Sequence, residues 1–267
     1  MKSAFKYIYG PVPSWRLGSS LGIDPVSKGR KICSFDCIYC QIGKTGLFTD
    51  ERKKFIEVKE IVGELAKLPA LKIDYITFSG AGEPTLAKNL GEMIKAVKLI
   101  RKESIAVITN GSLMRLAEVR KELALADFIV AKLDACSQES LQEINKPVKT
   151  VKYNDILEGI KKFRNEYKGK LALQIMFIEN NKHDFNKYIE LTNYIRPDEV
   201  QLNTPLRPVK IKPLAKEEIL KIKSHFKAAC QGINVISVYD QRASKDVTSI
   251  SDEQTLKRRG KTKCIPI

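Results

Sequence analysis

Short apolar runs alternate with amphipathic segments along most of the chain. The runs have the length of buried strands, and the segments between them carry apolar residues at helical spacing, as Ile156, Ile160 and Phe163 do. The expected strands are 21–24, 75–79, 105–109, 128–133, 173–178 and 200–203. The expected helices are 57–68, 88–102, 115–125, 154–167, 184–195 and 215–229, followed by an apolar run at 235–238.

This order predicts an α/β fold in which parallel strands curl into a partial (βα)6-type TIM barrel, with residues 1–243 as one domain. The opening segment, to about residue 20, carries several prolines and is expected to be irregular. Residues 244–267 lose the periodicity and are expected to form a loose basic tail. Ligands of such a barrel bind at the C-terminal ends of the strands, where polar residues gather in this chain.

Composition narrows the class of protein. The chain is 43% hydrophobic and 29% charged, as in ordinary globular proteins. It has no apolar stretch long enough to cross a bilayer, and its start lacks the apolar core of a secretory signal, so we expect a cytoplasmic protein that does not enter the membrane.

The formal net charge of +16 indicates attraction to polyanions and makes RNA a possible partner. If RNA binds, the expected footprint is Lys257, Arg258, Arg259, Lys261 and Lys263 together with Lys210 and Lys212. Scattered lysines on solvated helices explain much of the same charge. The sequence does not predict an oligomeric state.

Three of the six cysteines, Cys33, Cys37 and Cys40, lie within eight residues at the spacing C-x3-C-x2-C. Three thiolates in one loop, here residues 30–46, can hold three corners of a [4Fe–4S] cubane and leave the fourth iron without a protein ligand. A structural zinc ion would need a fourth ligand, and His183 and His225 are distant in sequence. Buried or incidental thiols are expected at Cys136, Cys230 and Cys264.

The segment CSFDCIYC resembles the signature of the radical S-adenosylmethionine (SAM) superfamily, and Ala81-Gly82-Glu83-Pro84 resembles its Gly-Gly-Glu-Pro turn, with alanine at the first position. Together with YGPVPSWRLGSSLGID, TNGS and QLNTPLRP, these segments resemble a branch of iron–sulfur oxidoreductases related to the wybutosine-synthesis enzymes. Members of that branch usually carry Arg-Arg where this chain has Trp15-Arg16.

The resemblance implies a radical SAM enzyme. Its [4Fe–4S] cluster, held by the three cysteines, would reductively cleave S-adenosyl-L-methionine to a 5′-deoxyadenosyl radical that abstracts hydrogen from an unidentified substrate. By the same resemblance, Glu83 would hold the methionine ammonium, Tyr39 would lie near the adenine, and further strand ends would line the cofactor. The cofactor-binding residues so implied are Tyr39, Gly82, Glu83, Pro84, Asn110, Asp134, Ile178 and Asn203.

Positive residues flank the cysteine loop, at Lys28, Arg30, Lys31 and Lys44. They would favour a reduced, more anionic cluster and the docking of an anionic electron donor such as a ferredoxin or a flavodoxin-like protein. The alternative function is that of a non-catalytic iron–sulfur or zinc protein that binds nucleic acid through its basic surface.

Overall fold

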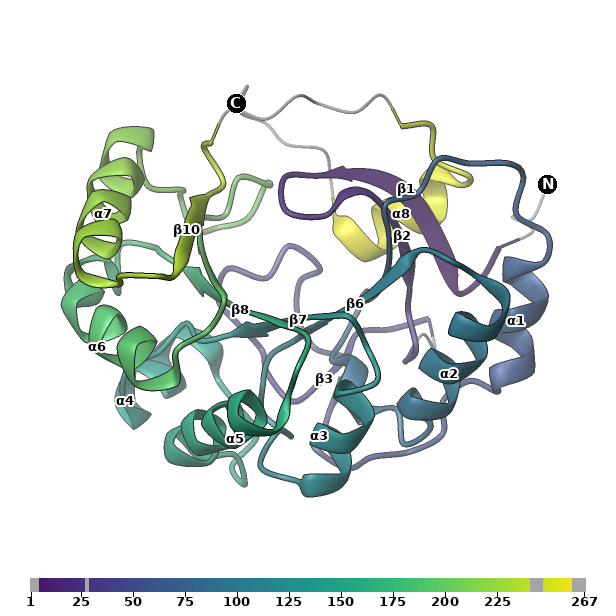
Figure 1. The fold of residues 1–267 in the computed structure, drawn as a ribbon, viewed down its shortest axis with the longest axis horizontal. Coiled ribbons are helices and arrows are strands. Elements are labelled where there is room, and N and C mark those ends of the chain that lie inside the picture. The colour runs from purple at the N-terminus through teal and green to yellow at the C-terminus, as the bar shows by residue number, and fades with distance from the viewer. Residues whose placement is uncertain (1–4, 27–28, 241–246, 261–267) are drawn as a thin grey trace.

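The computed structural model describes residues 5–26, 29–240 and 247–260. In these ranges the main sheet runs in the order β1 (Ile8–Ser14), β2 (Gly18–Ile23), β5 (Tyr75–Phe78), β6 (Ser104–Thr109), β7 (Phe128–Lys132), β8 (Lys170–Met176), β9 (Glu199–Asn203) and β10 (Asn234–Ser237). Neighbouring strands from β2 to β10 pair in parallel, and β1 pairs antiparallel to β2. The sheet is curled rather than flat (Figure 1).

Helices alternate with the parallel strands and cover the outside of the curled sheet (Figure 1). They are α1 (Val58–Leu65), α2 (Leu90–Ile100), α3 (Ala117–Leu123), α5 (Tyr153–Glu166), α6 (Phe185–Ile195) and α7 (Lys216–Ala229). Six strand–helix units therefore follow one another before β10, which confirms the predicted partial (βα)6-type TIM barrel. The predicted strands and helices all occur, with ends displaced by a few residues.

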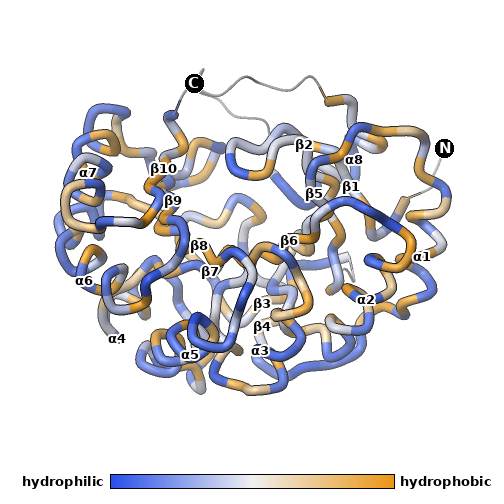
Figure 2. Tube along the Cα trace, in the orientation of Figure 1, coloured by the Kyte–Doolittle hydropathy of each residue, from blue (hydrophilic) through white to orange (hydrophobic). Residues whose placement is uncertain are grey.

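Alternation along the strands gives the sheet two apolar faces. Ile105 and Val107 of β6 belong to the large core between sheet and helices, whereas Ala106 between them packs with Leu17 and Phe128 on the opposite face. Figure 2 shows the corresponding mixture of hydrophilic and hydrophobic positions along the helices. A second outer core lies between β8, β9, β10, α6 and α7 and includes Phe177, Tyr188 and Phe226.

The expectation of an irregular opening segment is wrong. Residues 8–23 form the hairpin β1–β2, with a register shift between Tyr9 and Val12. Pro11 and Pro13 are tolerated because β1 is at the edge of the sheet, where one side of the strand needs no ladder hydrogen bonds. The prolines that suggested an irregular chain are thus typical of an edge strand.

The expectation of a loose tail is wrong for residues 252–259, which form helix α8 (Asp252–Arg259). Ser251 caps the helix by accepting from the Gln254 backbone N–H at 3.3 Å. The helix contacts β1, because the Gly10 backbone N–H donates to Thr255 Oγ1 at 3.0 Å. The proposed boundary near residue 243 lies outside the described residues.

Among the helices in the described ranges, none has both the length and the hydropathy that a membrane span requires.

Candidate functional site

The cysteine loop begins at a short second sheet formed by β3 (Ile32–Cys33) and β4 (Leu47–Phe48). Cys33 Sγ accepts a hydrogen bond from the Phe35 backbone N–H at 3.5 Å, and the Cys40 backbone N–H donates to the Cys37 carbonyl at 3.0 Å. Thr45 closes the loop by donating its hydroxyl to the Phe35 carbonyl at 2.8 Å. The loop that carries the three thiols is therefore folded by its own hydrogen bonds.

The Ala81–Pro84 turn follows β5 and pairs directly with this loop. The Ile32 backbone N–H donates to the Ala81 carbonyl at 3.2 Å, and the Glu83 backbone N–H donates to the Ile32 carbonyl at 3.0 Å. A Cβ at residue 82 would lie 1.9 Å from the Ile32 carbonyl oxygen, so only glycine permits this approach. Close backbone contact depends on Gly82 and is compatible with alanine at position 81.

Glu83 is buried, with a relative exposure of 2%. Its Oε1 accepts from the Thr85 backbone N–H at 3.0 Å, the Thr85 hydroxyl at 2.7 Å and the Thr109 hydroxyl at 2.6 Å. Its Oε2 accepts from the Asn110 backbone N–H at 2.7 Å. Burial raises the pKa of Glu83 above its usual value, although these donors act in the opposite direction. The carboxylate thus ties the end of β5 to the end of β6.

Two asparagine amides approach the cysteine sulfurs. Asn110 Nδ2 lies 3.7 Å from Cys33 Sγ, and Asn145 Nδ2 lies 3.4 Å from Cys37 Sγ. Burial raises the pKa of the Cys33 thiol well above its usual value and that of Cys37 to about 11. Free thiols would stay protonated here, so a bound metal centre would have to displace their protons.

Lys31 supplies positive charge beside the same sulfurs. Its Nζ donates to the Gly43 carbonyl at 2.9 Å and lies 3.6 Å from Asp36 Oδ1. Burial alone would lower the pKa of Lys31, but the thiols of Cys40, Cys33 and Cys37 raise it above its usual value. A buried ammonium next to thiolate ligands favours their anionic form.

Tyr39 and Asp134 form a buried polar pair next to the loop. The Tyr39 hydroxyl donates to Asp134 Oδ2, which also accepts from Asn145 Nδ2 at 3.2 Å and lies 3.2 Å from Lys132 Nζ. Burial and the Asp134 carboxylate raise the pKa of Tyr39 well above its usual value. Lys132 Nζ lies 5.2 Å from the centre of the Tyr39 ring, within cation–π range.

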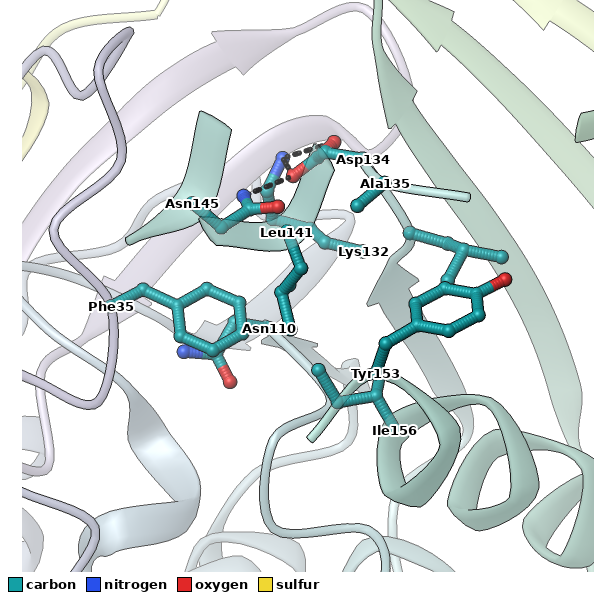
Figure 3. Close-up of a pocket in the computed structure, with 10 residues that line it drawn as sticks. Phe35, Asn110, Lys132, Asp134, Ala135, Leu141, Asn145, Tyr153 and Ile156 are labelled. Atoms are coloured by element: carbon teal, nitrogen blue, oxygen red, sulfur yellow. Dashed lines mark hydrogen bonds and ion pairs between the residues drawn. The ribbon is translucent and has the colours of Figure 1, made fainter. Parts of the chain in front are cut away.

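A small pocket of about 230 Å³, its open mouth included, lies between this polar group and α5. Figure 3 shows the side chains of Lys132 and Asn145 directed at Asp134 on one side of the pocket, with Leu141 beneath them. Phe35, Tyr153 and Ile156 supply further apolar lining. Polar atoms are thus concentrated near Asp134, in an otherwise largely apolar space.

The remaining predicted cofactor residues lie at the neighbouring strand ends. Ile178 is fully buried and packs with Tyr39 and Ile144 beside Cys37. Pro84 begins the short 3₁₀ turn η1 (Pro84–Leu86). Asn203, at the end of β9, is half-buried, and its Oδ1 accepts from the Thr204 backbone N–H at 2.9 Å. Tyr39, Glu83, Asn110, Asp134 and Ile178 therefore lie around the cysteine loop, whereas Asn203 lies at the end of β9.

Sequence reasoning did not find Asn145 or Lys132. Asn145 ends the turn η2 (Leu141–Asn145), which pairs with the loop because the Asp36 backbone N–H donates to the Asn145 carbonyl at 3.0 Å. No sequence signal marks this residue. Lys132 is the last residue of β7, and Asp134 lies two residues beyond it. Alternation along an extended chain would have put the two side chains on one face, and Lys132 Nζ lies 3.2 Å from Asp134 Oδ2.

The donor set fits an iron–sulfur cluster. Three thiols on one loop, two amide donors to sulfur and a buried lysine are the groups that hold and tune such a cluster. Within the described ranges, no three Cys, His, Asp or Glu side chains are placed to hold a single metal ion. A cubane spreads its thiolate ligands over separate irons, so the thiols need not converge on one point.

Other residues singled out from the sequence lie elsewhere. Cys230 is buried in the outer core beside β10, and Cys136 is half-buried against the same core. The His225 ring stacks on Phe185 at 4.8 Å, and His183 lies in the turn η3 (Lys182–Asp184). Cys264 and Lys28 lie outside the described residues.

The predicted RNA footprint needs a correction. Arg258 is buried and bonded to Asp24, so it cannot meet a phosphate at the surface. Lys257, Lys210 and Lys212 are exposed, and Arg259 is half-buried. The footprint residues Lys261 and Lys263 lie outside the described part of the chain.

Comparison with known proteins agrees with this geometry. The family model described as the Radical SAM superfamily matches residues 30–192, which include the cysteine loop and the Ala81–Pro84 turn. The UPF0026 protein of Synechocystis sp. is 44% identical over 81% of this chain and 81% of its own length.

Solved structures share the fold at low sequence identity. SuiB of Streptococcus suis bound to S-adenosylmethionine aligns with a TM-score of 0.61 at 14% identity, covering 78% of this chain and 48% of that one. Archaeal TYW1 aligns with a TM-score of 0.54 at 19% identity, covering 79% of this chain and 72% of that one. The chain thus spans about half the length of SuiB.

Proposed function

The chain belongs to the radical SAM superfamily of enzymes, which use a [4Fe–4S] cluster and S-adenosylmethionine, and on that premise we propose that it cleaves the cofactor to start a hydrogen abstraction. When bound, the cluster supplies the electron that breaks the S–C5′ bond, and the resulting 5′-deoxyadenosyl radical takes hydrogen from the substrate. In this proposal Cys33, Cys37 and Cys40 hold the cluster.

One observation carries the proposal: the cysteine loop and the Ala81–Pro84 turn are hydrogen-bonded to each other on both sides of Ile32. The residue after Ile32 is the first cysteine, and the residue before Glu83 is the glycine that allows the approach. A cluster ligand and the turn expected to face the methionine end of the cofactor are therefore fixed relative to each other. This arrangement supports chelation of the cofactor next to the loop.

Glu83 would hold the methionine ammonium directly and would also fix the end of β5 to the end of β6. Its Oε1 is saturated by three donors, whereas Oε2 accepts one hydrogen bond and keeps acceptor capacity for an ammonium group. Tyr39 and Ile178, which pack together, would form the apolar wall next to the nucleoside, and Asp134 would orient Tyr39. Asn203 would contribute from the far strand end.

Charge around the loop supports docking of an anionic electron donor such as a ferredoxin or a flavodoxin-like protein. Arg30 and Lys44 are exposed on the loop and available to such a donor. Lys31 is buried, so it would act on the cluster and not on the donor.

Anaerobic reconstitution tests the proposal. Full-length protein should bind about four irons and four sulfides per chain, absorb near ~400 nm, and release 5′-deoxyadenosine from S-adenosylmethionine after reduction with dithionite. Cys230→Ala serves as the matched control, since it removes a buried thiol far from the loop. A colourless protein that takes up zinc and binds RNA would reverse the conclusion in favour of the non-catalytic alternative.

A further inference from the structure

The sulfur of the first cysteine has a side-chain donor that comes from a strand end outside the loop. Asn110 directly follows β6, and its Nδ2 lies 3.7 Å from Cys33 Sγ and 2.9 Å from the Ser34 hydroxyl oxygen. The Ser34 hydroxyl shares a hydrogen bond of 2.7 Å with the Ser112 hydroxyl. From this chain of contacts we infer that the two serines are positioning residues: they hold the Asn110 amide against Cys33 and so raise the reduction potential of the bound cluster.

A backbone donor fixes the direction of the Asn110 amide. The Ser112 backbone N–H donates to Asn110 Oδ1 at 2.9 Å, and a backbone N–H cannot accept a hydrogen bond. The amide oxygen must therefore face Ser112, which leaves the amide nitrogen to face Cys33. Gly111 makes this return of the chain possible, because its φ of +78° lies in the left-handed region that glycine adopts readily.

Each proton of the Asn110 amide has one acceptor. One proton is directed at the Ser34 oxygen and the other at Cys33 Sγ. Asn145 is different, because its Nδ2 has three acceptors within 3.4 Å, of which only Cys37 Sγ is a thiol of the loop. Two protons cannot serve three acceptors at once. Asn110 is therefore the donor whose direction toward a ligand sulfur is better defined.

The serine hydroxyls keep the amide from turning away from the sulfur. Both serines are fully buried, so bulk water does not compete for the amide. The Val148 backbone N–H donates to the Ser34 carbonyl at 2.9 Å and holds this serine in place. In the part of the chain that the structure describes, the Ser112 hydroxyl bonds only to Ser34. Because the terminal torsion of asparagine is broad, loss of either hydroxyl should let the amide rotate and weaken its hydrogen bond to Cys33.

A donor to a ligand sulfur favours the reduced cluster, because reduction adds negative charge that the sulfur shares. Cys33 is buried, and a hydrogen bond acts more strongly in such surroundings than in water. The inference rests on the proposed function for the presence of the cluster. The reduction potential, however, can be measured without S-adenosylmethionine and without any substrate.

The fold should tolerate loss of these hydroxyls, because alanine differs from serine only by the hydroxyl group and an apolar replacement of both partners of a buried hydrogen bond can be nearly neutral. The chain also contains a matched pair. The hydroxyls of Ser20 and Thr77 are buried, are likewise 2.7 Å apart, and join β2 to β5. Ser20→Ala therefore removes an equivalent buried hydroxyl contact that does not involve Asn110.

The test is a redox titration of the anaerobically reconstituted full-length protein, followed by electron paramagnetic resonance. Ser34→Ala and Ser112→Ala should each lower the ratio of reduced to oxidised cluster at a fixed potential about threefold or more. For a one-electron couple, at about 59 mV per tenfold change, this is a lowering of the midpoint potential by about 30 mV. Asn110→Ala should lower it at least as much, Ser34→Thr should restore most of the potential, and Ser20→Ala should leave it unchanged.

A double-substitution cycle distinguishes positioning from a direct effect of the serines. In the Asn110→Ala background, Ser34→Ala and Ser112→Ala should shift the potential no further, because no amide remains to be held. Iron and sulfide content of the same preparations shows that each variant carries the full cluster.

A full additional shift in the Asn110→Ala background would overturn the positioning role. A wild-type potential in both serine variants would do the same, as would an equal shift in Ser20→Ala. If the potentials shift as described but no 5′-deoxyadenosine forms, the positioning role stands and the proposed function fails. If 5′-deoxyadenosine forms and the potentials do not shift, the proposed function stands and the positioning role fails.

Discussion

Arg258 and Asp24 form a buried ion pair across 234 residues of sequence, with Arg258 Nε 3.0 Å from Asp24 Oδ2. Asp24 directly follows β2, and its Oδ2 also accepts from the Ala81 backbone N–H at 3.1 Å. The pair thus joins the C-terminal helix to the turn that contacts the cysteine loop. Through it, α8 becomes part of the support of the site.

Arg258→Ala should destabilise the protein by about 3–5 kcal/mol, because it leaves the Asp24 carboxylate buried without its partner. Chemical denaturation monitored by circular dichroism measures the loss. Lys257→Ala is the matched control: Lys257 pairs with Glu253 on the exposed side of the same helix, and such pairs contribute little. Equal effects of the two substitutions would contradict the role given to Arg258.

The effect of Arg258→Ala should also depend on pH. Burial raises the pKa of Asp24 above its usual value, and Arg258 acts in the opposite direction. A carboxyl whose pKa is higher in the folded state loses stability as pH rises from its unfolded pKa through its folded pKa. Without Arg258 the pKa of Asp24 in the folded state rises further, so the pH range over which stability is lost extends to higher pH. The variant should therefore lose more stability at about pH 7 than at about pH 5. Unfolding curves of wild type and Arg258→Ala at both pH values measure this difference in stability loss. When Asp24→Asn is present in both proteins, the pH dependence of the loss should disappear.

Much of the fold could be predicted from periodicity, because six strand–helix units repeat with clear apolar faces. The tail helix could also have been predicted. Ser251 followed by two acidic residues is a typical helix start, and basic residues followed by Gly260 are a typical helix end. The prediction of a loose tail failed because it relied on apolar residues at helical spacing, whereas α8 is mostly polar. Its anchor could not be predicted, since nothing in sequence connects Arg258 to Asp24.

The candidate site was predictable as far as local motifs extend. The cysteine spacing and the Ala81–Pro84 turn can be recognised from neighbouring residues in the sequence. The Asn145 amide is distant from Cys37 in sequence and comes close to it only in the folded chain. The same holds for Gly10 and Thr255, which form a hydrogen bond because a hairpin and a distant helix pack against each other. Contacts between distant segments are set by packing of the whole chain, and one sequence carries no direct signal for them.

Replacement of any of Cys33, Cys37 and Cys40 by alanine should abolish a stable cluster, since each removes one of three protein ligands. Cys136→Ala and Cys230→Ala should retain full iron and sulfide, because both thiols lie by the outer core. Iron analysis and the absorbance near ~400 nm distinguish the two groups. Full iron content in a variant of the first group would remove that cysteine from the ligand set.

Asn145→Leu should lower the reduction potential of the cluster. The Asn145 amide lies 3.4 Å from Cys37 Sγ, and a hydrogen bond to a ligand sulfur favours the reduced, more anionic state. Redox titration followed by electron paramagnetic resonance measures the shift. Asn180→Leu is the control, since Asn180 is exposed and bonds Glu143. An unchanged potential in Asn145→Leu would show that this amide does not tune the cluster.

Glu83→Gln should keep the cluster and weaken binding of S-adenosylmethionine about tenfold, since a charge-assisted contact is worth roughly 1.5–3 kcal/mol. A glutamine can still accept with its amide oxygen from Thr85 and Thr109, so most of the turn survives; its amide nitrogen would face the Asn110 N–H. Glu83→Ala removes every acceptor and should also lower stability. Calorimetry for the cofactor and thermal unfolding for the fold separate the two effects, with Glu179→Gln as an exposed control. If Glu83→Gln binds the cofactor as wild type does, Glu83 only joins β5 to β6, and the ammonium must be held by other groups.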